Sequence, residues 1–267
     1  MNETISLTPL DLTLATLLVA AAGGVSMALR LGLEKRLAIA AARTVIQLLL
    51  VGYILRYVFG STSPWLLIPM VCTMIYAASR AALERVGKAY PGVGLDAFVT
   101  LALSGIVTTV AVTQGIIRIT PWHDPRYIIP LLGMILGNSL TGVSLCLDSI
   151  LTQLRDRRDL IEMELAFGAT RWEAARDCIR EAVRRAMIPT INSMTVVGIV
   201  SLPGMMTGQI LAGNPPVEAV KYQIVAMFMI AAAGAAACMM SALLACRRLF
   251  TERHQLRPRP APPRPNA

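Results

Sequence analysis

Seven long apolar stretches dominate the sequence and limit what the chain can fold into. A helix needs about 20 apolar residues to cross the hydrocarbon core of a bilayer. Hydrophobic residues make up 55% of the chain, whereas charged residues make up 15% and aromatic residues 5%. This composition favours an all-α bundle of transmembrane helices over a β-barrel. We expect spans at residues 10–31, 37–59, 65–83, 95–117, 127–151, 187–211 and 222–246.

The Lys and Arg residues are distributed unequally between the two sides of these spans. Twenty of the 25 lie in segments 30–36, 80–88, 151–186 and 247–267. The positive-inside rule then places the N-terminus outside and the C-terminus in the cytosol. We expect the membrane to be the plasma (inner) membrane. The same asymmetry explains the net charge of +9, so we expect a lipid bilayer and no nucleic acid as a partner.

The spans and one long cytosolic segment account for nearly the whole chain. We expect one transmembrane domain over residues 1–250, which includes the cytosolic segment 152–186. Residues 251–267 are rich in Arg and Pro and are predicted to form a disordered cytosolic tail. The cysteines, at positions 72, 146, 178, 238 and 246, form no CxxC pair, and we interpret them as reduced packing residues.

Motifs for several kinds of chemistry are absent from the sequence. There is no GxxxxGK[ST], HExxH or GxSxG, and the histidines are His123 and His254. A P-loop, an intramembrane serine protease and a zinc site are therefore not expected. We predict a non-enzyme with no catalytic residues and no cofactor of its own, and the sequence identifies no metal ligands.

The cytosolic segment contains two helix start signals around a sharp corner. Asp159 with Glu162 resembles a capping box, and Thr170 with Glu173 gives a second one. Gly168 lies between them and is a natural helix stop. We expect a short helix over residues 160–167 and a second helix from 171 that continues into the sixth span.

An exposed short helix between spans suggests that a soluble partner docks on it. Ile161, Leu165 and Phe167 would supply apolar contacts in such an interface. The alternative is a helix lying on lipid headgroups. Glu162 and Glu164 favour the partner, because carboxylates are repelled by anionic lipid.

The sixth span contains a predicted break at Pro203 and Gly204. Proline removes a backbone donor and glycine weakens a helix, and broken helices often occur at transporter sites. Gln209 and the thioethers of Met205 and Met206 follow, and we predict a gate or transport path here. A plain packing kink and a weak soft-metal contact through the methionines are the alternatives.

Other polar residues lie within predicted spans. Arg43 and Gln47 are one turn apart in the second span, and Asn138 is in the middle of the fifth. A pair between Arg43 and Asp148 would satisfy both charges. These residues either line a path or tie helices together.

Residues 164–223, which include ELAFGATRWEAA and SLPGMMTGQILAG, resemble the FetB family of ABC-type permeases. RTVIQL at 43–48 and GNSLTG at 137–142 also resemble that family. The resemblance implies a homodimeric permease that exports an iron-like metal ion, with ATP hydrolysed on a separate ATP-binding cassette subunit. It also implies that the short helix is a coupling helix, in which Glu162, Ala166, Gly168 and Ala169 match the E-A-A…G pattern. Met163 and Glu164 depart from that pattern, and its closing proline is not at the usual spacing.

Two other functions remain open at this point. An ATPase-independent secondary transporter or channel would use the broken sixth span alone. A receptor or structural membrane protein would use the cytosolic segment to bind a regulator. Neither the transported substrate nor the direction of transport follows from the residues themselves.

Overall fold

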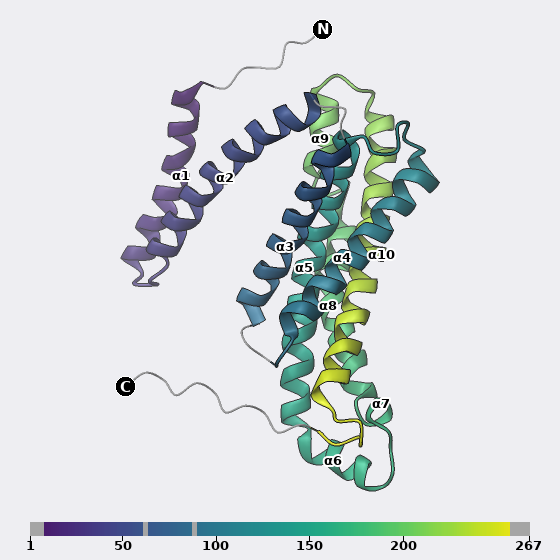
Figure 1. Ribbon diagram of the computed structural model, residues 1–267. Helices are drawn as coiled ribbons and strands as arrows, with labels where there is room; N and C mark the ends of the chain where they lie inside the picture. Colours follow the sequence, from purple (N-terminus) through teal and green to yellow (C-terminus); the bar gives the residue numbers. More distant parts are fainter. Residues whose placement is uncertain (1–7, 61–63, 87–89, 257–267) are drawn as a thin grey trace.

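The computed structural model describes residues 8–60, 64–86 and 90–256, and it contains ten α-helices within those ranges (Figure 1). The all-α prediction is confirmed. A 3₁₀ turn, Pro64–Leu66, precedes α3, and a π-helical segment, Ala111–Ile117, continues α4. The α-helices are α1 Pro9–Ala28, α2 Glu34–Gly60, α3 Leu67–Val86, α4 Val93–Val110, α5 Pro125–Asp156, α6 Arg158–Ala166, α7 Arg171–Ala174, α8 Arg176–Val196, α9 Gly204–Leu211 and α10 Pro216–Leu249.

Helices α5 and α10 form the centre of the bundle, with α3, α4 and α8 packed around them. Small side chains let the two central helices approach closely. A Cβ placed on Gly142 of α5 would lie 2.9 Å from the Sγ of Cys238 on α10. Both Cys146 and Cys238 are fully buried, and the Sγ of Cys146 donates to the Cys238 carbonyl at 3.3 Å. This small-residue contact is the usual way for membrane helices to pack.

The hairpin of α1 and α2 extends away from this bundle (Figure 1). Its two helices pack on each other. Near its C-terminal end α2 joins a small apolar cluster in which Val58 packs with Leu67 and Ile129. Most side chains of both helices are exposed within a single chain, as expected for helices that face lipid or another membrane protein.

Six helices in the described part of the chain are long and apolar enough to cross a membrane. They are α1, α2, α3, α4 with its π-helical extension, α5 and α10. Of the seven predicted spans, the sixth, at residues 187–211, does not form such a helix. Here the chain instead forms the second half of α8, an irregular segment 197–203 and the short helix α9. The first half of α8 is charged, so that the helix as a whole is not an apolar span.

The break in this region starts earlier than the sequence predicted. Helix α8 ends at Val196, and Gly198 adopts a φ of 83°, a conformation that favours glycine. The Gly198 N–H donates to the Ser201 carbonyl at 2.9 Å and closes the turn. Pro203 is the N-cap of α9, where its missing N–H interrupts no helix. The break that the sequence predicted at Pro203 and Gly204 therefore lies before these residues, which form the start of α9.

The bundle has two distinct ends, named here after α6 and α9. At the α6 end, α5 runs into α6, and the turn after α10 contacts the start of α7. At the α9 end, α9 and the start of α10 lie beside the start of α5. Helices α8 and α9 together therefore carry the chain from one end to the other (Figure 1). Helix α10 has 34 residues, roughly 50 Å of length, so it returns through the whole bundle.

The segment after α10 begins with an ordered turn. Phe250 and Leu256 form an isolated bridge, and Phe250 is 1% exposed. The Thr251 N–H also donates to the Gln255 carbonyl at 2.8 Å. The rest of the predicted disordered tail, residues 257–267, lies outside the described residues.

Candidate functional site

A cavity of about 390 Å³ lies at the α9 end. Four elements meet there: α9, the start of α10, the start of α5 and the end of the π-helical segment. Met205 and Gln209, which the sequence indicated as path residues, both line it. Sequence reasoning missed the other polar lining residues, Tyr127, Asn214, Glu218 and Tyr222.

Local turns bring these elements together. The π-helical segment ends at Arg118, whose φ is 58°, and Asp124 caps α5 by accepting a 2.9 Å bond from the Arg126 N–H. Helix α9 ends before Gly213, with a φ of 89°, and the Asn214 N–H donates to the Gln209 carbonyl. The chain then reverses into α10, which places Glu218 at the cavity.

The cavity offers a mixed set of polar groups. Gln209 and Asn214 supply amides, Met205 a thioether and Glu218 a carboxylate, which pairs with Lys221 at 2.7 Å. No three His, Cys, Asp or Glu side chains in the described ranges are grouped so as to hold a metal ion. The cavity therefore suits transient contact with a polar or hydrated ion better than tight chelation.

The remaining predicted path residues are not gathered in this cavity. Arg43 and Gln47 are exposed on α2, and Asn138 is exposed on α5 with its Nδ2 donating to the Met134 carbonyl at 2.9 Å. Asp148 is also exposed, and among the described residues it forms no ion pair with Arg43. Within one copy of the chain, the predicted path residues thus lie on separate surfaces.

The α6 end carries the predicted docking corner. Gly168 has a φ of 93°, and the Ala169 N–H donates to the Glu164 carbonyl at 3.1 Å, so α6 stops as expected. The capping box of Thr170 and Glu173 is also confirmed. These hydrogen bonds from Thr170 lower the pKa of the Glu173 carboxyl. The corner therefore has a fixed shape.

Two details of the corner differ from the sequence prediction. Asp159 is not an N-cap, because α6 already starts at Arg158, and Glu162 pairs with Arg158 at 2.7 Å instead. Ile161 is 2% exposed and packs in the core, and Leu165 packs against that core too. Ile161 therefore holds the corner in place rather than presenting a contact surface.

The exposed apolar face of α6 is formed by the predicted contact residue Phe167 together with Leu160 and Met163, which were not among the predicted contact residues. Leu160 is 47% exposed, Met163 49% and Phe167 84%. Their spacing of three and four residues places them along one side of the helix. The other predicted contact residues, Glu162, Glu164, Ala166 and Ala169, lie in the same segment and are exposed or half-buried.

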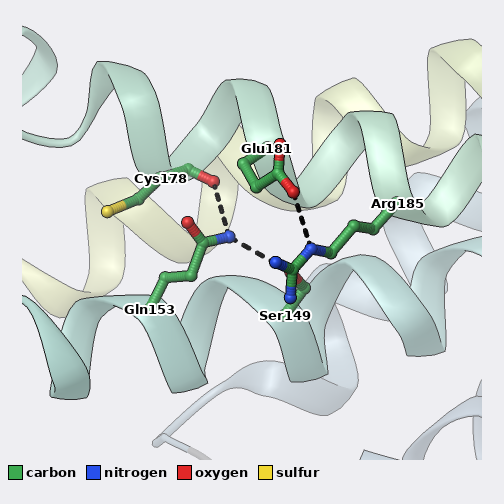
Figure 2. Close-up of polar contacts among 5 residues, drawn as sticks. All are labelled: Ser149, Gln153, Cys178, Glu181 and Arg185. Carbon is green, nitrogen blue, oxygen red and sulfur yellow. Dashed lines mark hydrogen bonds and ion pairs between the residues drawn. The ribbon is translucent and has the colours of Figure 1, made fainter.

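Polar bonds tie this corner to the bundle. Gln153 on α5 is buried, and its Nε2 donates to the Ser149 Oγ at 3.2 Å and to the Cys178 carbonyl of α8 at 3.5 Å (Figure 2). Further along α8, Arg185 pairs with Glu181 at 2.7 Å (Figure 2). Gln153 thus links the two helices that enter and leave the corner.

The chain is similar in sequence to several known membrane proteins and transport proteins over most of its length. The chain is 35% identical over 250 residues to the Escherichia coli (strain K12) "Probable iron export permease protein FetB", covering 92% of this chain and 93% of that protein. It is 33% identical over 243 residues to the "UPF0014 membrane protein STAR2" of Oryza sativa subsp. japonica, covering 91% and 84%. It is 30% identical over 226 residues to the "Protein ALUMINUM SENSITIVE 3" of Arabidopsis thaliana, covering 85% and 81%.

No solved structure is significantly similar to the chain. The family described as "Uncharacterised protein family (UPF0014)" matches residues 9–250, which include every helix of the bundle. The chain therefore belongs to the UPF0014 family of multi-pass membrane proteins.

Proposed function

We propose that the chain is the permease subunit of an ATP-driven transporter that exports a metal ion. The observation that carries the proposal is the docking corner: a short helix that projects from one end of a membrane bundle with an exposed apolar face. The name of the Escherichia coli relative supports iron as the class of cargo. The chain has no P-loop of its own, so a separate ATP-binding cassette subunit supplies the ATPase activity.

The proposed orientation has seven passes. Helices α8 and α9 connect the two ends of the bundle, and they add one crossing to the six long apolar helices. With the Arg-rich α6 end in the cytosol, the corner faces the compartment that contains ATP. The α9 end and its cavity then open toward the exterior, where a cargo leaves.

The functional unit is proposed to contain two copies of the chain. Helix α5 leaves Asn138 and Asp148 exposed on a membrane helix, and the neighbouring α8 leaves Asn192 and Thr195 exposed. Polar groups at membrane depth are costly unless they face protein or water. Pairing two such surfaces around a wet path would satisfy these groups and complete the route that one copy lacks.

The docking corner provides the test. The tagged chain is purified from its native cells, and the ATP hydrolysis that accompanies it is measured. Phe167→Glu places a charge on the exposed face of α6 and should abolish most of that activity. Phe167→Leu keeps the face apolar and should retain it. If Phe167→Glu retains full ATPase activity, α6 is not the docking element.

Transport is measured in parallel with inverted membrane vesicles. Radiolabelled Fe(II) should accumulate when ATP is added, and the accumulation should fall with Phe167→Glu but not with Phe167→Leu. Iron movement that needs no ATP and is unchanged by Phe167→Glu would favour the alternative, a secondary transporter or channel. If another cation moves in place of iron when ATP is added, the cargo in the proposal is wrong but the role as an ATP-driven permease stands.

A further inference from the structure

A second and larger cavity, of about 1250 Å³, lies at the α6 end. Its walls come from the segment before α4, the end of α5, the start of α6, α7, and the end of α10 with the turn that follows. Five arginines and only two carboxylates, Asp96 and Glu252, line it. The arginines are Arg155, Arg158, Arg171, Arg247 and Arg248.

Three of the five arginines form no ion pair in the described part of the chain. Arg248 pairs with Asp96 at 3.3 Å, and Arg158 pairs with Glu162 at 2.7 Å. For the other three arginines, no described carboxylate lies within ion-pair distance. Arg171 also buries its Nε without an acceptor. A buried guanidinium N–H without a partner is costly. Arg155 and Arg247, in contrast, are exposed, so their guanidinium groups can meet an anion in the cavity.

Tyr90 and Asp96 also line the cavity. Tyr90 is 6% exposed, and its hydroxyl is buried. Burial and the nearby Asp96 carboxylate raise the pKa of this phenol, so that it stays protonated. Gly92 has a φ of 91°, and its missing side chain makes room for the Arg248 guanidinium, 3.3 Å from where a Cβ would lie. The Arg248 guanidinium therefore packs directly on the backbone at Gly92.

Apart from Thr251, the rest of the lining is apolar. Leu151 and Leu154 of α5, and Leu244 and Leu249 of α10, form that part of the wall. Along α10, the apolar stretch ends at Cys246 and two arginines follow directly. The cavity lining therefore combines leucines and arginines at the end of α10 where the apolar stretch gives way to charged residues.

We propose that this cavity binds the phosphate of an anionic phospholipid headgroup, with the leucine wall holding the start of an acyl chain. Arginine forks match phosphate oxygens, and basic pockets between membrane helices on the cytosolic side suit anionic headgroups. A soluble phosphate shares the arginine chemistry but makes no use of the leucines. A lipid therefore fits both the arginines and the leucines that line the cavity.

The test uses the purified full-length chain in neutral detergent. Binding of phosphatidylglycerol, phosphatidylcholine and inorganic phosphate is measured separately by native mass spectrometry and by the shift in thermal unfolding. We expect phosphatidylglycerol to bind at least about tenfold more tightly than phosphatidylcholine. Equal binding of the two lipids would overturn the proposal. If inorganic phosphate binds as tightly as phosphatidylglycerol and displaces it, the cavity is a phosphate site and not a lipid site.

Two double variants locate the site. Arg155→Gln with Arg247→Gln removes two cavity arginines that form no described ion pair, and should weaken phosphatidylglycerol binding at least about tenfold. Arg176→Gln with Arg180→Gln removes the same charge from the exposed surface of α8, outside the cavity, and should change binding less than twofold. If both double variants lose phosphatidylglycerol binding equally, the lipid is attracted by the general surface charge, and the proposed site is wrong. If the cavity pair fails to purify, Arg247→Gln alone should show about a threefold loss.

Discussion

The backbone N–H of Arg171 donates a hydrogen bond of 3.1 Å to Nδ1 of His254. The two residues are far apart in the sequence, one at the start of α7 and the other in the turn after α10. The Sγ of Cys246 also lies 3.9 Å from the Arg171 carbonyl. The docking corner is therefore held by the end of the longest helix as well as by its own neighbours.

Replacing His254 by Ala should loosen this corner without unfolding the bundle. The Arg171 N–H would lose its protein acceptor, a loss of about 1 kcal/mol, which corresponds to roughly fivefold faster hydrogen exchange at residues 170–174. Exchange mass spectrometry of the purified chain measures this directly. The neighbouring change Arg253→Ala should leave exchange at the corner as it was. Unchanged exchange in His254→Ala would show that the bond does not hold the corner.

Gly142→Ala should destabilise the contact between α5 and α10. The new methyl group would lie 2.9 Å from the Sγ of Cys238, and overpacking of this kind costs about 1–3 kcal/mol. Thermal unfolding in detergent should therefore occur several degrees lower.

Two variants serve as controls for that change. Gly137→Ala lies in the same helix with nothing within 4 Å of its Cβ, and it should be neutral or slightly stabilising because alanine favours helix. Adding Cys238→Ala to Gly142→Ala removes the sulfur and should recover part of the loss. Equal unfolding temperatures for Gly142→Ala and Gly137→Ala would rule out a tight contact.

Gly198→Ala should disturb the break between α8 and α9. A φ of 83° is strained for alanine, at a cost of roughly 1–2 kcal/mol. Thermal stability and iron transport should both fall.

Gly208→Ala, inside α9 and with open space around its Cβ, is the control and should leave both thermal stability and iron transport intact. The double change Pro203→Ala with Gly204→Ala should also leave the break in place, since the helix has already ended at Val196. If this double change lowers thermal stability and iron transport more than Gly198→Ala does, the break depends on Pro203 and not on Gly198.

Met205→Ala should widen the cavity at the α9 end. Met205 lines it and Met206 does not, although both are half-buried. We expect Met205→Ala to raise passive iron leak or uncoupled ATP hydrolysis severalfold, with iron binding unchanged, because a gate is loosened and no ligand is lost. Met206→Ala is the matched control and should have a smaller effect. A loss of directly measured iron binding in Met205→Ala would instead make the thioether a ligand.

Sequence patterns predicted the features that depend on neighbouring residues. The apolar stretches gave the all-α class, Gly168 gave the end of α6, and Thr170 with Glu173 gave the second capping box. Ile161 was misplaced because its burial depends on packing against distant helices, which its own spacing does not encode. The break was placed at Pro203 because proline is a stronger signal than Gly198, whose effect depends on its φ.

The α9 cavity shows the same limit of local reasoning. Met205 and Gln209 were found because they follow a visible break in an apolar stretch. Tyr127 and Glu218 belong to other elements and become neighbours only when the chain has folded. Their positions next to a π-helical segment and a glycine turn carry no sequence signal that single-residue preferences would detect.

The hairpin of α1 and α2 touches the rest of the protein mainly around Val58. The hairpin precedes α10 in the chain and its own contacts are local, so it can form before α10 has been made. Helix α10 packs on α4, α5, α8 and α9. The central bundle is therefore complete only once α10 is in place.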